Sequence, residues 1–120
     1  MKSSMSFNLR NFFDHENRYD ILVNGINHYE KNGFFSDEII HLIRSMSDFL
    51  YEKMKSSEGN LYGVLTDIED ISKAGDTYKI SIKVSKIYFK NNQSMDNLYE
   101  KTETYTLNFN VKKRSFMLKR

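Results

Sequence analysis

Residues 77–89 read TYKISIKVSKIYF, and over most of this stretch apolar and polar side chains alternate. Alternation with a period of two is typical of a β-strand that buries one face. The inward positions are predicted to be Tyr78, Ile80, Ile82 and Val84, and the outward positions Lys79, Ser81, Lys83 and Ser85. The apolar positions then move to Ile87 and Phe89, which predicts a β-bulge near Ser85 or Lys86.

The same period of two runs through the rest of the chain after Gly59. It predicts further strands at residues 61–71, 98–111 and 116–118, the first of them joined to residues 77–89 by a tight turn at Ala74-Gly75-Asp76. Because the strands are long for a small domain, we expect the antiparallel sheet of three to four strands to be strongly twisted and curved.

The first half of the chain has a helical period instead. Residues 11–32 predict one helix that begins at the cap Asp14 and ends at Gly33, and residues 36–54 predict a second that begins at the cap Ser36. The predicted fold class is therefore α+β, with two or three N-terminal helices packed on a curved antiparallel sheet. We expect one domain over residues 11–120, preceded by a flexible leader at 1–10.

Composition excludes several functions. The 18 basic and 16 acidic residues give a net charge of +2, which is too small to attract nucleic acid or an anionic membrane over a distance. The absence of cysteine excludes disulfides, thiolate metal sites and a cysteine nucleophile. No apolar run is long enough to cross a bilayer, so membrane contact would need a segment absent from this chain.

No residue pattern indicates a catalytic site, a metal site or a cofactor. The histidines His15, His28 and His41 are too far apart in sequence to pair on one helical turn, and the acidic cluster at residues 67–70 fits a solvated strand edge. The basic end of the chain, at residues 112–120, either grips phosphate or is a solvated turn, and the inward period of its aromatic neighbours favours the turn. We therefore predict a chain that is not an enzyme.

Two groups of aromatic residues are candidates for binding. A ligand pocket inside a curved sheet would be lined by Tyr19, Tyr51, Tyr78 and Tyr105. Two aromatic pairs flank the first predicted helix, and they either staple its ends to the sheet or contact a partner protein. These pairs are Phe12-Phe13 and Phe34-Phe35.

The order of elements resembles the cystatin-like cone of the nuclear-transport-factor-like superfamily. The resemblance is carried by YEKNGFF (29–35), FLYEKMKSSEG (49–59), VLTDIEDISKAGDTYKISIKVSKIYF (64–89) and ETYTLNFNVKKRSFML (103–118). It is similar to the domains of this superfamily found in Gram-positive surface proteins and in scaffold subunits of conjugation machines. That resemblance implies an extracytoplasmic, non-enzymatic module for assembly or ligand binding; without it we expect a cytoplasmic protein.

Three functions follow from these observations. The first is a non-catalytic interaction or scaffold module that binds a protein partner, or a second copy of itself, through the outer sheet face or the aromatic helix ends. The second is a small-ligand-binding protein, or an isomerase-like enzyme, that uses the tyrosine pocket. The third is a mobile-element or phage protein that inhibits a host factor.

Overall fold

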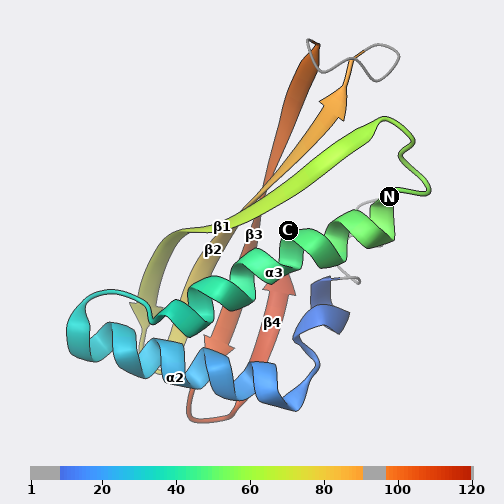
Figure 1. Ribbon diagram of the computed structural model, residues 1–120. Helices are drawn as coiled ribbons and strands as arrows, with labels where there is room; N and C mark the ends of the chain where they lie inside the picture. The colour runs from blue at the N-terminus through green and yellow to red at the C-terminus, as the bar shows by residue number, and fades with distance from the viewer. Residues whose placement is uncertain (1–8, 91–96, 120) are drawn as a thin grey trace.

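The computed structural model describes residues 9–90 and 97–119. A short helical segment at residues 9–13 is followed by two helices and four strands. The elements are α2 (Glu16–Asn32), α3 (Asp37–Met54), β1 (Leu61–Ala74), β2 (Thr77–Phe89), β3 (Leu98–Asn110) and β4 (Ser115–Lys119). Figure 1 shows both long helices on one face of a twisted antiparallel sheet with the strand order β1-β2-β3-β4, which confirms the predicted α+β class.

The register of the sheet places its irregularities in β1 and not in β2. Pairing between β2 and β3 is unbroken from Thr77 opposite Asn110 to Phe89 opposite Leu98. The two register shifts lie in β1, between Leu61 and Gly63 and between Ile68 and Asp70. The bulge predicted near Ser85 or Lys86 is therefore wrong, because the even positions of β2 keep facing inward as far as Tyr88.

The N-terminal helix begins differently from the prediction. The chain bends after the segment at 9–13, and α2 starts at Glu16 with His15, not Asp14, as its N-cap. The bend lets both helical pieces face the sheet, because Leu9, Phe12 and Phe13 are all buried. Of the predicted leader, residues 1–8 lie outside the described residues, whereas Leu9 belongs to the core.

The ends of the long helices agree with the sequence. Gly33 has a left-handed backbone (φ 82°) and donates its N–H to the Tyr29 carbonyl at 2.7 Å, as expected for a glycine that ends a helix. Ser36 is the N-cap of α3, with Asp37 and Glu38 in the first turn where they oppose the positive end of the helix dipole. The Ser36 hydroxyl makes no capping hydrogen bond. Ser36 is therefore the N-cap of α3 by its backbone position alone, and its side chain does not cap the helix.

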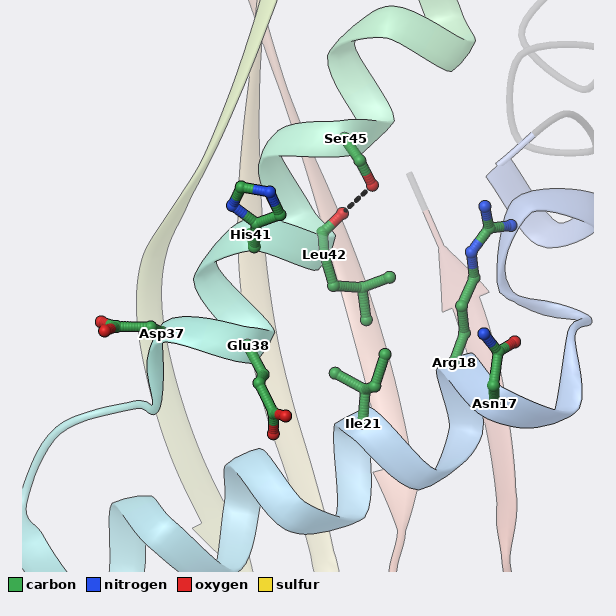
Figure 2. A pocket seen from close by; sticks show the side chains of 8 residues that line it. All are labelled: Asn17, Arg18, Ile21, Asp37, Glu38, His41, Leu42 and Ser45. Atoms are coloured by element: carbon green, nitrogen blue, oxygen red, sulfur yellow. Dashed lines mark hydrogen bonds between the residues drawn. The ribbon is translucent and has the colours of Figure 1, made fainter.

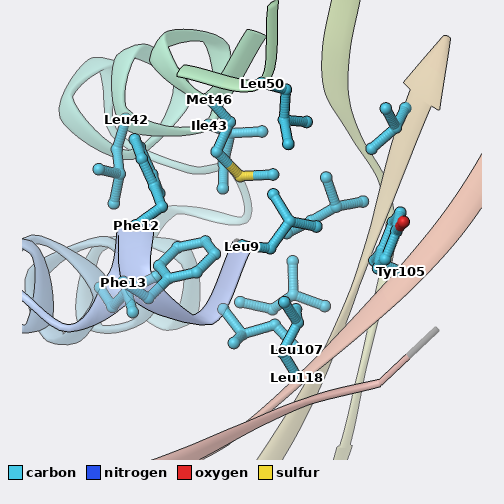
Figure 3. Packing of buried hydrophobic residues seen from close by; sticks show 14 of the residues in the cluster. Leu9, Phe12, Phe13, Leu42, Ile43, Met46, Leu50, Tyr105, Leu107 and Leu118 are labelled. Carbon is cyan, nitrogen blue, oxygen red and sulfur yellow. The ribbon is translucent and has the colours of Figure 1, made fainter. Parts of the chain in front are cut away.

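The core lies between the helices and the inner face of the sheet. Figure 3 shows Leu9 between side chains of α3 and the strand residues Leu107 and Leu118. The predicted inward residues of β2 and β3 are all buried, namely Tyr78, Ile80, Ile82, Val84, Tyr105, Leu107 and Phe109. The Thr66 hydroxyl of β1 donates to the Ile43 carbonyl of α3, which fixes that helix over β1. Burial of this face is the main source of stability for the fold.

Candidate functional site

An apolar cluster lies on the outer face of the sheet, at the end formed by the start of β1, the end of β2 and the start of β3. We call it the distal patch. Its members are Tyr62, Leu65, Ile87, Phe89 and Leu98. Tyr62, Leu65 and Leu98 have 42%, 61% and 37% of their surfaces exposed. Large apolar side chains that gather on an exposed face mark a binding surface more often than scattered ones do.

Register explains how the distal patch forms. Phe89 lies directly opposite Leu98, and Ile87 lies opposite Gly63 on the other neighbouring strand. The register shift after Leu61 makes Tyr62 an extra residue in β1, and its ring reaches that of Phe89 with centroids 5.2 Å apart. The apolar shift noticed at Ile87 thus marks a second apolar face and not a bulge in β2.

Apart from the exposed Met117 of β4, the rest of the outer face is mainly polar. Asp67 of β1 lies directly opposite Lys83 of β2, and farther along the same face a hollow of about 350 Å³ is lined by serine, threonine, asparagine and lysine side chains. Its lining residues are Ser72, Lys79, Ser81, Thr106, Asn108 and Lys119. The outer face therefore changes from polar to apolar toward the distal patch.

A charged pair that the sequence analysis missed lies on the inner face. The Lys86 ammonium lies 3.0 Å from the Glu103 carboxylate, and only 10% and 18% of these side chains are exposed. The Tyr105 hydroxyl donates to the same carboxylate at 3.2 Å. The period of two could have predicted this burial of Lys86, because Lys86 lies midway between Val84 and Tyr88, both of which face inward. These hydrogen bonds compensate the two charges, so the arrangement is that of a structural ion pair.

A second inner-face contact links the sheet to the turn that follows α3. The Tyr88 hydroxyl donates to Glu58, and the Tyr88 ring stacks on Tyr99 with centroids 5.3 Å apart. Burial raises the pKa of the Tyr88 hydroxyl above its ordinary value of 10.0, and the hydrogen bond to Glu58 raises it further. Neutral Tyr88 therefore stabilises the folded chain.

This shift predicts a loss of stability in alkali. Because the folded pKa is raised, the stabilisation is complete below pH 10, the pKa of an unfolded tyrosine, and is lost as pH rises toward the folded pKa. The urea midpoint of the wild type should fall more between pH 9 and pH 11 than that of Tyr88→Phe, which has no hydroxyl to ionise. Equal falls in the two proteins would show that Tyr88 is not the group responsible.

The four tyrosines proposed as a pocket point to different places. The Tyr78 hydroxyl donates to Glu30, the Tyr105 hydroxyl lies against Glu103, and Tyr51 is a half-buried residue of α3 whose ring lies 5.8 Å from the Lys55 ammonium. The described residues therefore do not bring the four hydroxyls together in one aromatic pocket.

Tyr19 packs separately against the end of the sheet. Its ring lies between Phe109 and the guanidinium of Arg114, which is 4.4 Å from the ring centroid and 3.1 Å from Asp20. Burial raises the pKa of the Tyr19 hydroxyl, and Arg114 lowers it in part. Arg114 of the basic end is thus held in the structure as a turn residue that packs on Tyr19.

The two phenylalanine pairs differ in how much of their surface is exposed. Phe12 and Phe13 are each only 1% exposed, so a partner cannot contact them in the folded chain, and their role is the stapling one. Phe35 is half-buried and stacks on Tyr29, with centroids 4.9 Å apart. Phe34 is 62% exposed and is the one member of the two pairs that a partner can reach readily.

A pocket between α2 and α3 was not foreseen from the sequence. It holds about 450 Å³, and Ile21 and Leu42 face each other across it (Figure 2). Two of its polar groups are already engaged: the Ser45 hydroxyl donates to the Leu42 carbonyl at 2.7 Å, and Arg18 donates to the Phe12 carbonyl. No set of polar side chains converges inside this pocket as a catalytic centre requires.

The described residues also limit other functions. Within 9–90 and 97–119, no three His, Asp or Glu side chains gather closely enough to hold a metal ion. The helices of this part of the chain are too short or too polar to cross a membrane.

Comparison with known protein families, characterised proteins and solved structures finds no match. The functional argument for this chain therefore rests on the surfaces described above, and the resemblance to the nuclear-transport-factor-like superfamily stays a prediction.

Proposed function

We propose that this chain is a non-catalytic protein-interaction module that binds a partner through the distal patch. The observation that supports this proposal is the exposure of Tyr62, Leu65 and Leu98 on one face of the sheet. Burying these side chains against a partner would gain roughly 25 cal/mol for each Å² of apolar surface removed from water. The partner surface that fits is apolar where it meets these side chains and must also accommodate the Glu100 carboxylate, because exposed Glu100 lies directly opposite Ile87 on the same face.

The position of the distal patch also favours contact with a large partner. In Figure 1 the ends of β2 and β3 rise beyond α2 and α3, so the helices do not shield this end of the sheet. Such an arrangement suits a scaffold subunit of the kind that the cone-like resemblance implies. The host-factor inhibitor predicted as an alternative would use the same surface, with a host protein as its partner.

Ligand binding or isomerase chemistry is the less supported function. Its predicted pocket needs the four tyrosines to converge, and their hydroxyls lie in separate surroundings. The interhelical pocket is large enough for a small apolar ligand, but it contains no convergent polar groups to orient one.

Charge substitution tests the proposed interaction. We expect Leu65→Glu, which puts a charge on the most exposed member of the distal patch, to abolish capture of proteins that the wild-type chain enriches from its native cells. The matched control is Met117→Glu, since Met117 is 54% exposed on the outer face but lies in β4, outside the patch. Quantitative mass spectrometry of the captured proteins would measure the difference.

The same experiment separates the distal patch from the other exposed aromatic. Phe34→Glu changes a residue that is as exposed as Leu65 but lies next to the end of α2. If Phe34→Glu abolished capture of the partner and Leu65→Glu did not, the distal patch would not be the binding surface. The partner would then bind at the aromatic end of α2. Both variants change surface residues, so circular dichroism should show an intact fold.

A further inference from the structure

The polar hollow on the outer face of the sheet is built from all four strands, and we call it the outer hollow. It holds about 350 Å³, and every side chain that lines it carries a hydroxyl, amide or ammonium group. The register of the sheet brings these groups together across β3, which runs through the middle of the hollow. The lining side chains are Ser72 of β1, Lys79 and Ser81 of β2, Thr106 and Asn108 of β3, and Lys119 of β4.

The polar groups of the outer hollow are not used by the protein itself. Within residues 9–90 and 97–119, none of the six lining side chains has a hydrogen bond or an ion pair. Lys79 and Lys119 differ in this respect from Lys73 and Lys86, which pair with carboxylates at 2.7 Å and 3.0 Å. The Asn108 Oδ1 atom is buried and has no hydrogen-bond partner. A buried acceptor in this state needs a donor from outside the chain, because burial without a hydrogen bond is costly.

The charge of the outer hollow is positive. Its two ammonium groups come from opposite sides of β3, since Lys79 lies opposite Asn108 on one side and Lys119 lies opposite Thr106 on the other. No carboxylate of the described residues lines the hollow, and Asp70 lies beside it on the same face, opposite Ser81. Ammonium groups attract phosphate as point charges, and hydroxyl and amide N–H groups donate to its oxygen atoms.

We propose that the outer hollow binds a phosphorylated sugar. The phosphate group lies between the ammonium groups of Lys79 and Lys119. A phosphate ester carries almost two negative charges at pH 7 and offers acceptors only, so the donor that Asn108 Oδ1 needs is a sugar hydroxyl. The serine and threonine hydroxyls both donate and accept, which matches the hydroxyls of a sugar. The volume of about 350 Å³ is in the range of small-molecule sites, roughly 300–1,000 Å³.

A nucleic acid fits the outer hollow less well, although it also carries phosphate. Proteins that bind single strands stack the bases on aromatic side chains beside the cations. None of the lining side chains is aromatic, and the exposed neighbour opposite Asn108 in β4 is Met117. The hollow therefore lacks the platform on which bases would stack.

Isothermal titration calorimetry at pH 8 tests the proposal with glucose, inorganic phosphate, and a panel of hexose and pentose monophosphates. We expect a sugar phosphate to bind at least tenfold more tightly than glucose or inorganic phosphate. Lys79→Gln should weaken this binding by about tenfold, because it removes one of the two ammonium groups. The matched control is Lys83→Gln, an exposed lysine on the same face of β2 that does not line the hollow, and its affinity should equal that of the wild type.

Asp70→Asn should strengthen the binding by about twofold, because it removes a negative charge next to the outer hollow. A gain of this kind cannot result from misfolding. The proposal is overturned if no sugar phosphate of the panel binds at millimolar concentration, or if inorganic phosphate binds as tightly as all of them. Equal losses in Lys79→Gln and Lys83→Gln would also overturn it, since they would indicate attraction by net charge alone.

The outer hollow and the distal patch are tested independently. Leu65→Glu changes the distal patch and should leave the affinity for the sugar phosphate unchanged. Lys79→Gln should in turn leave partner capture unchanged, because Lys79 is not a member of the distal patch. Failure of one proposal is therefore distinguishable from failure of the other.

Discussion

Replacing Phe12 with alanine is expected to lower the free energy of unfolding by about 3–5 kcal/mol, the usual cost of removing a buried phenylalanine ring. The Phe12 ring is 1% exposed and lies 5.2 Å from the ring of Phe13 and 5.3 Å from that of Phe49, between centroids. The Arg18 guanidinium lies 3.9 Å from its centroid, so this ring joins the short helical segment to both α2 and α3. Its loss would leave a cavity that three elements line.

Urea unfolding of the wild type and Phe12→Ala measures this effect. The control is Phe34→Ala, which removes a ring that is 62% exposed and should change stability by less than about 1 kcal/mol. A change below about 1 kcal/mol for Phe12→Ala would contradict the packing described here. If the expected loss is found, any loss of partner binding by Phe12 or Phe13 variants reflects unfolding and not a missing contact.

Gly25→Ala is expected to destabilise the chain by about 1–3 kcal/mol, although alanine favours a helix interior over glycine by about 1 kcal/mol. A Cβ atom added at Gly25 would lie 2.8 Å from the Cβ atom of Ile39. Both atoms are attached directly to the backbone, so no change of rotamer relieves the overlap. The helices α2 and α3 would have to separate, and this cost exceeds the gain in helix propensity.

The control for Gly25→Ala is Asn24→Ala on the same turn of α2. Asn24 is exposed, so this change should give a small gain in stability from helix propensity alone. The urea midpoints of the two variants should therefore move in opposite directions. A Gly25→Ala protein more stable than the wild type would show that α2 and α3 do not approach each other closely at this point.

The elements with one clear period were predictable from the sequence. In α3 the cap Ser36, the acidic first turn and the apolar stripe all indicated the same helix, and the structure confirms it. In β2 and β3 the inward positions from Tyr78 to Val84 and from Tyr105 to Phe109 were correct because each strand buries one face there. The turn at Gly75, which has a φ of 63°, was also correct.

The prediction failed where it depended on both faces of the sheet or on how two segments of the chain pack together. Ile87 and Phe89 suggested a bulge because they break the pattern of β2, but both sides of the sheet are apolar at that end. The actual shifts lie in β1, where they depend on how β1 pairs with β2, and one strand alone does not reveal its register. The start of α2 was misplaced because Phe12 and Phe13 fit a longer helix as well as a short segment followed by a bend.

The candidate site was predictable only in outline. An interaction through the outer sheet face was among the predicted routes, but the residues named for contact were the helix-end phenylalanines, two of which are buried. The distal patch combines residues from three strands, so its members become neighbours only once the register is known. The Lys86–Glu103 pair was missed for the same reason.

The irregular backbone of β1 has a consequence for how far assembly can proceed. An edge that contains two extra residues, near Tyr62 and near Glu69, offers an incoming strand a broken ladder of donors and acceptors. Lateral addition of chain after chain, the growth step of a fibril, needs two regular edges on every subunit. With β1 interrupted in this way, we expect addition of a further strand at this edge to be unfavourable, even at high protein concentration.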